Sequence, residues 1–277
     1  MDTPPTRTLL LDDAGFNQLV RGRDGYFLYN RNDPYIGRAL EKYGEYSRQE
    51  MVLFRQIVRA GDVVVEVGAN IGVHTLGLAR AVGPAGRVLA FEPQRLVFQT
   101  LCANVALNSL DNVDCRWAAL GTQDGMITVP ELDPRASLNF GGVSLLEGGS
   151  GFQVACMPLD RLGTLPRVNF VKIDVEGMEA EVLRGGTQLL ARFKPVLYVE
   201  NDRIEKSEDL IRLIAGLGYR LYWHLPLLFD ADNYFRDPED VFPNMISCNM
   251  LCLHQDLKTQ LEGFQEITDY AAHPLRR

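Results

Sequence analysis

The chain has 277 residues, of which 46% are hydrophobic and 23% are charged, enough for one large globular domain with an extension. Its 36 acidic residues outnumber its 28 lysines and arginines, which gives a formal net charge of -8. This balance provides no general affinity for a phosphate backbone, so we expect no nucleic-acid partner.

The sequence shows no feature of a membrane or secreted protein. No apolar stretch approaches the roughly 20 residues that cross a bilayer, and the N-terminus lacks a basic region followed by an apolar run. Five cysteines occur without a Cys-x-x-Cys pair, which is typical of reduced, mostly buried thiols. We therefore expect a cytoplasmic protein without a membrane span.

The N-terminal part differs from the rest. Residues 1–47 are polar and rich in turn-forming residues, so they are predicted to be an extension or cap of a main domain over residues 48–277. Apolar residues at helical spacing predict a helix over 47–59. The β-branched run 63–67 then predicts a strand that is buried on both faces.

Strands and helices alternate after residue 61, which indicates a doubly wound α/β domain. The last two predicted strands are joined by a loop without a helix, whereas parallel neighbours need a crossover. We therefore predict a seven-stranded, mostly parallel sheet with a final antiparallel strand. The predicted strands are 63–67, 87–91, 113–117, 168–174, 196–200, 219–223 and 246–253, and the predicted helices between them are 73–81, 96–107, 178–184 and 207–217.

Two long segments interrupt this alternation. Short strands are predicted at 126–130 and 152–159, and the residues between them are rich in Gly and Ser. Long loops inside a domain are often binding lids. We expect the loops 130–151 and 225–245 to determine which acceptor is used.

A glycine-containing loop follows the first strand of the domain. Glu66, Gly68, Asn70 and Gly72 form a G-x-N-x-G pattern, in which asparagine replaces the second glycine of a dinucleotide fingerprint. This pattern disfavours a pyrophosphate and favours a cofactor derived from methionine. Glu66 is predicted to bind its amine, and backbone N–H groups of the loop are predicted to bind its carboxylate.

Glu92 ends the second strand, one strand, helix and strand after the glycine loop. A carboxylate at this place can accept hydrogen bonds from both hydroxyls of a ribose. We therefore assign Glu92 to the ribose of the same cofactor.

At this point the chain resembles the FkbM-type methyltransferases. The motifs are Glu66-Val-Gly-Ala-Asn-Ile-Gly72, Phe91-Glu-Pro93, Ala118-Ala-Leu-Gly121, Leu159-Asp-Arg-Leu162 and Lys172-Ile-Asp-Val-Glu-Gly177, in the family's order over residues 48–254. The resemblance implies the class I, Rossmann-like methyltransferase fold, S-adenosylmethionine as cofactor, and O-methylation of sugars or secondary-metabolite hydroxyls, as in natural product biosynthesis. By position, Trp117 and Ala118 are expected beside the adenine.

Polar residues at three further strand ends suggest the chemistry. Asp174 is predicted to lie beside the sulfonium and the acceptor, and His224 to take the hydroxyl proton. Asp174, Glu200 and Asn201 are oxygen donors from adjacent strand ends, and hard cations such as Mg²⁺ prefer such ligands. We therefore keep a catalytic Mg²⁺ site, with Glu200 part of the machinery, as an additional hypothesis.

Other functions remain open. The same fold could methylate nitrogen on a small molecule or protein, although Asp174-Val-Glu-Gly177 stands where many N-methyltransferases have an Asn-Pro-Pro-Tyr type of motif. A nonenzymatic scaffold that binds S-adenosylmethionine is a second alternative. A nicotinamide dehydrogenase is disfavoured by Asn70 and by the final pair of strands.

Overall fold

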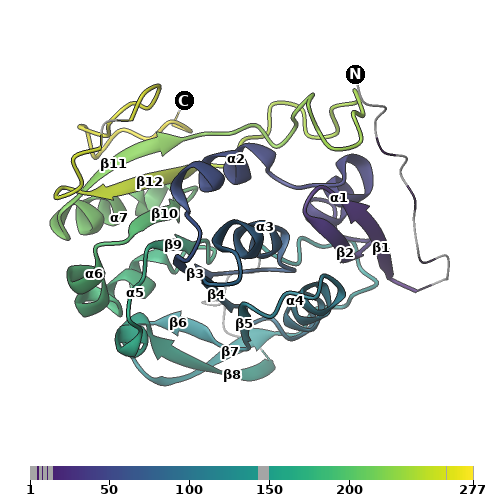
Figure 1. The fold of residues 1–277 in the computed structure, drawn as a ribbon, viewed down its shortest axis with the longest axis horizontal. Coiled ribbons are helices and arrows are strands. Elements are labelled where there is room, and N and C mark those ends of the chain that lie inside the picture. Colours follow the sequence, from purple (N-terminus) through teal and green to yellow (C-terminus); the bar gives the residue numbers. More distant parts are fainter. Residues whose placement is uncertain are drawn as a thin grey trace.

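The computed structural model describes residues 5, 8, 11, 15–142, 150–259 and 261–276. Its main sheet consists of β3 (Val63–Val67), β4 (Arg87–Phe91), β5 (Val113–Arg116), β9 (Phe170–Ile173), β10 (Val196–Glu200), β11 (Tyr219–His224) and β12 (Asn249–His254). The order is β11-β12-β10-β9-β3-β4-β5, and β12 runs antiparallel to both of its neighbours while the other pairs are parallel. This confirms the predicted doubly wound, class I methyltransferase arrangement (Figure 1).

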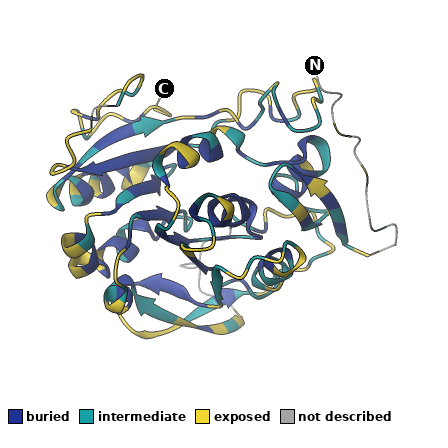
Figure 2. Cartoon of the chain, viewed as in Figure 1, coloured by how far each residue is buried: buried dark blue, intermediate teal, exposed yellow. Residues whose placement is uncertain are grey.

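Helices cover both faces of this sheet. On one face lie α2 (Arg48–Ile57), α3 (Val73–Val82) and α4 (Arg95–Leu107), and on the other α5 (Glu179–Arg184), α6 (Thr187–Phe193) and α7 (Ile204–Gly216). Val64 packs with α2 and α3, whereas Val63 and Val65 belong to the core under α5, α6 and α7. Side chains of a strand alternate between its faces, so the valines of β3, which is buried along its whole length, contribute to both cores (Figure 2).

The N-terminal residues form more structure than their turn-rich composition indicates. They contain the hairpin of β1 (Asn17–Gly22) and β2 (Gly25–Asn30), followed by α1 (Ile36–Tyr43), beside α4 in Figure 1. The buried Asn104 of α4 bonds the backbone N–H and C=O of Leu28 and also donates to the carbonyl of Ile71. One side chain thus joins the hairpin, α4 and the glycine loop, and the division at residue 47 stays a prediction.

A second, smaller sheet contains β6 (Ala119–Gly121), β7 (Gly125–Pro130) and β8 (Gly151–Pro158), in the order β6-β8-β7, before the 3-10 helix Leu159–Thr164. The two short strands predicted around the Gly-rich loop are therefore present, and they pair with each other antiparallel. Among the described residues, no helix has the length and apolar character needed to cross a bilayer.

Candidate functional site

The loop after β3 is held in a conformation that requires glycine. Gly68 has φ +81°, and a Cβ at this position would lie 1.8 Å from the carbonyl oxygen of Asp174. The backbone N–H groups of Gly68 and Ala69 both donate to the carbonyl of Phe91, at 3.0 and 2.9 Å. The ends of β3, β4 and β9 therefore meet closely, leaving backbone rather than side chains facing the crevice.

Glu92 joins the glycine loop to the end of β4. Its carboxylate accepts hydrogen bonds from the backbone N–H of Asn70 at 2.9 Å and of Gln94 at 2.8 Å. Burial raises the pKa of Glu92 to about 7, although these two bonds oppose the shift. Each oxygen keeps a further lone pair, so the carboxylate can still accept hydroxyl groups of a ligand.

A cavity of about 550 Å³ lies beside this loop at the carboxyl ends of β3, β9 and β10, within the size range of small-molecule sites. Its lining includes Gly68, Asn70 and Glu92, together with Asn139, Gly141 and Gly142. It also includes residues of α2, of α3, of the turn before α2 and of the long loop before β12. These are Tyr46, Glu50, Val73, His74, Leu228, Met245, Ser247 and Cys248, among others. The predicted loop positions Asn139 and Leu228 therefore reach the cavity.

Lys172 and Asp174 form an ion pair in the cavity wall, in which Lys172 is buried and the Asp174 side chain is 37% exposed. The Lys172 ammonium lies 2.9 Å from Oδ2 of Asp174, and Lys172 is only 2% exposed. Burial acts to raise the pKa of Asp174, but the ammonium beside it holds that pKa below its usual value. Lys172 had no role in the sequence-based prediction. Its spacing of two residues from Asp174 could have indicated the pair, because side chains two apart in a strand lie on the same face.

Three carboxyl groups meet at the ends of β9 and β10. Asp174, Glu176 and Glu200 each offer an oxygen, and these oxygens lie within 4.8 Å of one another. Burial and the neighbouring carboxylates raise the pKa of Glu200 well above its ordinary value, and its Oε2 has no hydrogen-bond partner among the described residues. Burial and Asp174 likewise raise the pKa of Glu176 to about 7.

Asn201 is not a member of this cluster, and its predicted place in a metal site is wrong. Its amide donates to Oγ of Ser207 at 3.0 Å and to Sδ of Met250 at 3.3 Å, and the residue is 3% exposed. Because successive side chains of a strand point to opposite faces, the residue after Glu200 turns away from it. The third oxygen donor comes instead from Glu176.

The imidazole in the cavity wall is that of His74. It is 4% exposed in the first turn of α3, and its Nε2 lies 3.6 Å from Oε2 of Glu50. That nitrogen has no hydrogen-bond partner among the described residues. Burial and the nearby Lys172 ammonium lower the pKa of His74 to about 3, so the ring is neutral. No spacing rule in the sequence connects His74 to Glu50 of α2, so this contact could not be predicted.

The structure does not bring His224 to the cavity, which corrects its expected place beside the acceptor. Its Nδ1 lies 2.7 Å from the Tyr198 hydroxyl, and its ring contacts that of Phe264. Burial lowers its pKa to about 4. Strand β11 does end at the predicted edge of the sheet, but it is separated from β10 by β12.

Ala118 and Trp117, both predicted beside the adenine, have different surroundings. Ala118 borders a small apolar pocket together with Gly68, Pro93 and Val175. Trp117, 41% exposed, lies outside the lining of the large cavity, and its indole donates to the Pro93 carbonyl at 2.8 Å.

Glu66 and Gly72 lie behind the cavity wall rather than in it. Glu66 is fully buried, and one of its oxygens accepts a hydrogen bond of 2.6 Å from Thr75. Its other oxygen has no hydrogen-bond partner among the described residues, and burial raises its pKa to about 7. The structure therefore places no carboxylate oxygen of Glu66 at the cavity surface, in contrast to the predicted amine contact.

The cavity wall is rich in acidic side chains: Lys172 holds the pKa of Asp174 low, whereas burial raises the pKa values of Glu50, Glu92, Glu176 and Glu200, which a cationic ligand would lower again. Among the described residues that line it are six carboxyl groups (Glu50, Glu92, Asp174, Glu176, Glu200 and Asp202) and the two cationic side chains of Lys172 and Arg203. S-adenosylmethionine carries a positive sulfonium and a positive amine, and its ribose hydroxyls match the remaining acceptor capacity of Glu92. The residues present therefore fit this cofactor.

The chain is similar to known methyltransferases. The Methyltransferase FkbM domain matches residues 66–221, more than half of the chain. The hexuronic acid methyltransferase AglP of Haloferax volcanii is 35% identical over 155 residues, covering 56% of this chain and 62% of that protein. The ribosomal RNA large subunit methyltransferase E of Nitratidesulfovibrio vulgaris is 42% identical over 210 residues, covering 72% of this chain and 95% of that protein.

A solved structure titled Methyltransferase FkbM, from Methylobacillus flagellatus KT, matches with a TM-score of 0.45 and 18% identity, covering 73% of this chain and 50% of that one. The chain spans 57% to 62% of the length of the first curated methyltransferases that it matches. The domain match, together with the ordered motifs from the glycine loop to Lys172–Gly177, shows that the chain belongs to the FkbM family of methyltransferases.

Proposed function

We propose that this protein transfers a methyl group from S-adenosylmethionine to a hydroxyl oxygen of a sugar or secondary-metabolite acceptor. The observation that carries the proposal is the acid-rich cavity at the carboxyl edge of the sheet, whose lining includes the glycine loop, Glu92, His74 and Glu50. Similarity to a hexuronic acid methyltransferase supports an acceptor of the sugar type.

The cofactor would be held by residues from three strand ends. The glycine loop would lie against its methionine part, Glu92 would bind its ribose, and its adenine would lie on the side of Ala118, where the present pocket of about 10 Å³ has to widen to receive it. S-adenosylmethionine supplies, when bound, a methyl group on a sulfonium that a nucleophilic oxygen can displace. The ionised Asp174, fixed by Lys172, would stabilise positive charge at this place.

We assign the removal of the hydroxyl proton to His74. An alcohol is a weak nucleophile at neutral pH, but its proton becomes strongly acidic as the oxygen gains a methyl group. A neutral imidazole of low pKa can therefore take that proton at Nε2, which is buried beside Glu50 in this structure and has to turn toward the cavity when the acceptor binds. Glu50, 3.6 Å from this nitrogen, would stabilise the imidazolium that results.

A bound Mg²⁺ is the less favoured form of this proposal. Asp174, Glu176 and Glu200 could hold a hard cation through their oxygens. However, the Lys172 ammonium already lies within hydrogen-bonding distance of Asp174 and supplies the local positive charge. We therefore propose catalysis without a metal, for which turnover is unchanged by a chelator.

The similarity to a ribosomal RNA methyltransferase makes RNA the second candidate acceptor. The net charge of -8 and the carboxyl groups around the cavity oppose the approach of a phosphate backbone. We favour a small hydroxyl acceptor for this reason. Methylation of ribosomal RNA but of no sugar or natural-product hydroxyl would reverse the choice.

The assignment of the base is tested by two histidine substitutions. General-base loss typically costs 10²–10⁴-fold, so His74→Gln should lower kcat by about that factor while the Kd for S-adenosylmethionine stays within about threefold. The matched control is His224→Gln, which removes an imidazole outside the cavity and should retain turnover. The reverse pattern, with His224→Gln inactive and His74→Gln active, would overturn the assignment.

A further inference from the structure

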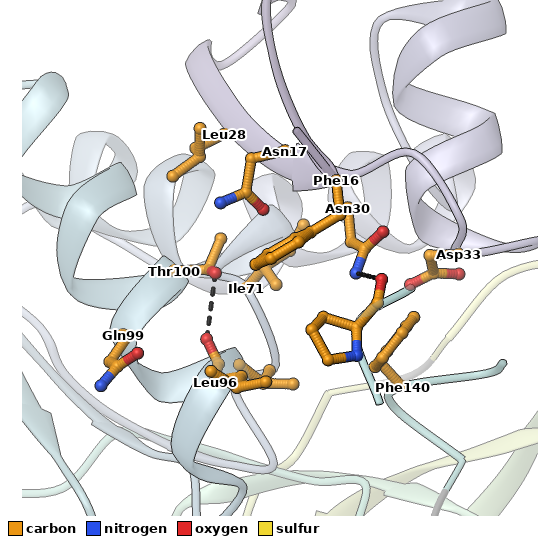
Figure 3. Close-up of a pocket in the computed structure, with 12 residues that line it drawn as sticks. Phe16, Asn17, Leu28, Asn30, Asp33, Ile71, Leu96, Gln99, Thr100 and Phe140 are labelled. Atoms are coloured by element: carbon orange, nitrogen blue, oxygen red, sulfur yellow. Dashed lines mark hydrogen bonds between the residues drawn. The ribbon is translucent and has the colours of Figure 1, made fainter. Parts of the chain in front are cut away.

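A second cavity lies between the N-terminal hairpin, α4 and the segment that ends at Phe140. Its volume is about 150 Å³. Figure 3 shows Phe16, Ile71, Leu96 and Phe140 converging around the same space, with Leu28 and Asn17 from the hairpin. None of the substrate or cofactor roles assigned above uses this pocket.

The polar groups around this pocket are mostly engaged within the protein. The Asn30 amide donates to the Pro134 carbonyl, and the Thr100 hydroxyl donates to the Leu96 carbonyl, as Figure 3 shows. Asp33 accepts the backbone N–H groups of Tyr35 and Ile36. The inner surface is therefore left to the side chains of Phe16, Leu28, Ile71, Leu96, Val97 and Phe140.

Two residues separate this pocket from the groups that would hold the cofactor. Phe140 borders both the pocket and a small cleft that also contains Glu92 and Asp174. Ile71 belongs to the glycine loop and directly follows Asn70, which lines the large cavity. Both are less than a tenth exposed. A group bound in the pocket would therefore lie immediately behind the cofactor loop.

The size and the lining define the ligand. An engineered cavity of the same volume lined by Leu, Ile and Phe binds benzene. A sugar ring of that size would leave its hydroxyls unpaired against these apolar side chains, at a cost of several kcal/mol. The amides of Asn17 and the exposed Gln99 can meet one polar substituent of an otherwise apolar group.

We propose that this pocket binds a single neutral aromatic ring or short branched hydrocarbon group. The group is either a substituent of the methyl acceptor or a separate small molecule. The first source rests on the proposed function, because the acceptor would then carry its reacting hydroxyl into the acidic cavity and its apolar group into this pocket, with the Phe140 side chain displaced to join the two spaces.

The test uses 4-fluorophenol as a probe, followed by fluorine NMR, so that binding is measured without turnover. Wild type should bind it saturably, and glucose should not compete. Leu96→Trp, which fills the pocket, and Gln99→Trp, which covers it from an exposed position, should each raise the Kd at least tenfold. Leu107→Trp is the control, since Leu107 is 45% exposed at the far end of the same helix. The proposal is overturned if wild type shows no saturable binding, or if both pocket variants bind the probe with the wild-type Kd.

A second arm distinguishes the two sources. If the acceptor supplies the group, a phenyl glycoside should have a KM at least tenfold below that of the free sugar, and Leu96→Trp should abolish this difference. If a separate molecule supplies it, the two acceptors should have equal KM values while 4-fluorophenol still binds. Because the probe is followed without turnover, an inactive enzyme that binds it would contradict only the proposed function.

Discussion

The ion pair of Lys172 and Asp174 allows a quantitative prediction. Replacing Lys172 by Met keeps most of its volume and removes the ammonium that faces Asp174, Glu66 and Glu50. Removing one partner of a buried pair leaves an uncompensated charge, which typically costs 3–5 kcal/mol. Lys172 is 2% exposed and its ammonium is 2.9 Å from Asp174, but the Asp174 side chain is 37% exposed and water can solvate it, so we expect a loss of about 2–3 kcal/mol at pH 8, at or below the lower end of this range.

The loss should be smaller at pH 5.5. Without Lys172 the three carboxyl groups have raised pKa values, and at low pH they can take up protons and become neutral. Urea unfolding of wild type and Lys172→Met at both pH values measures the difference. Lys194→Met is the control, because Lys194 pairs with Asp256 at the surface and should cost less than about 1 kcal/mol. A Lys172→Met loss below about 1 kcal/mol, equal at both pH values, would refute this account of the cavity wall.

Three further predictions concern Glu92, Leu228 and the proposed absence of a metal. Burial raises the pKa of Glu92 to about 7 from an ordinary 4.5, so between pH 4.5 and pH 7 the folded state holds more protons than the unfolded state. The free energy of unfolding should therefore fall as the pH rises through this range, by up to about 3 kcal/mol for this group. Urea unfolding at pH 5 and pH 8 should show the fall, and Glu92→Gln should reduce it; an equal slope in the variant would contradict the sign. Leu228 lines the large cavity, so Leu228→Trp should reduce the space for the acceptor and raise the acceptor KM at least tenfold, while calorimetry shows an unchanged Kd for S-adenosylmethionine. Loss of cofactor binding instead would show that this loop belongs to the cofactor site. A chelator should leave kcat unchanged, and restoration by Mg²⁺ after inactivation would establish the metal form.

The sheet could be predicted from the sequence because its signals are local. The run Val63–Val67 is apolar at every position except Glu66, as suits a strand between two helical layers, and the structure gives it these same bounds. The missing helix before β12 correctly indicated an antiparallel strand, since a parallel one needs a crossover. The family motifs added the cofactor, and Gly68, Asn70 and Glu92 all border the large cavity.

The remaining site residues depend on contacts between segments far apart in the chain. Glu50 and His74 meet because α2 packs on α3, and their spacing of 24 residues carries no signal of this contact. His224 was predicted from the strand-end rule, which places the backbone but does not say which face the ring takes. The hairpin β1–β2 was missed because its burial comes from α4 rather than from its own composition.

The measurement that tests the central claim most directly is transfer of a deuterated methyl group from S-adenosylmethionine to a mixed library of sugar and natural-product hydroxyls, read by mass spectrometry. We predict a single labelled methyl group on oxygen of a hydroxyl-bearing acceptor, with wild type and His224→Gln active. We also predict that Glu92→Ala loses binding of the cofactor, on the order of 2–4 kcal/mol for two charge-assisted hydrogen bonds. Wild-type cofactor affinity in Glu92→Ala, or a label found only on nitrogen or on ribosomal RNA, would contradict the account.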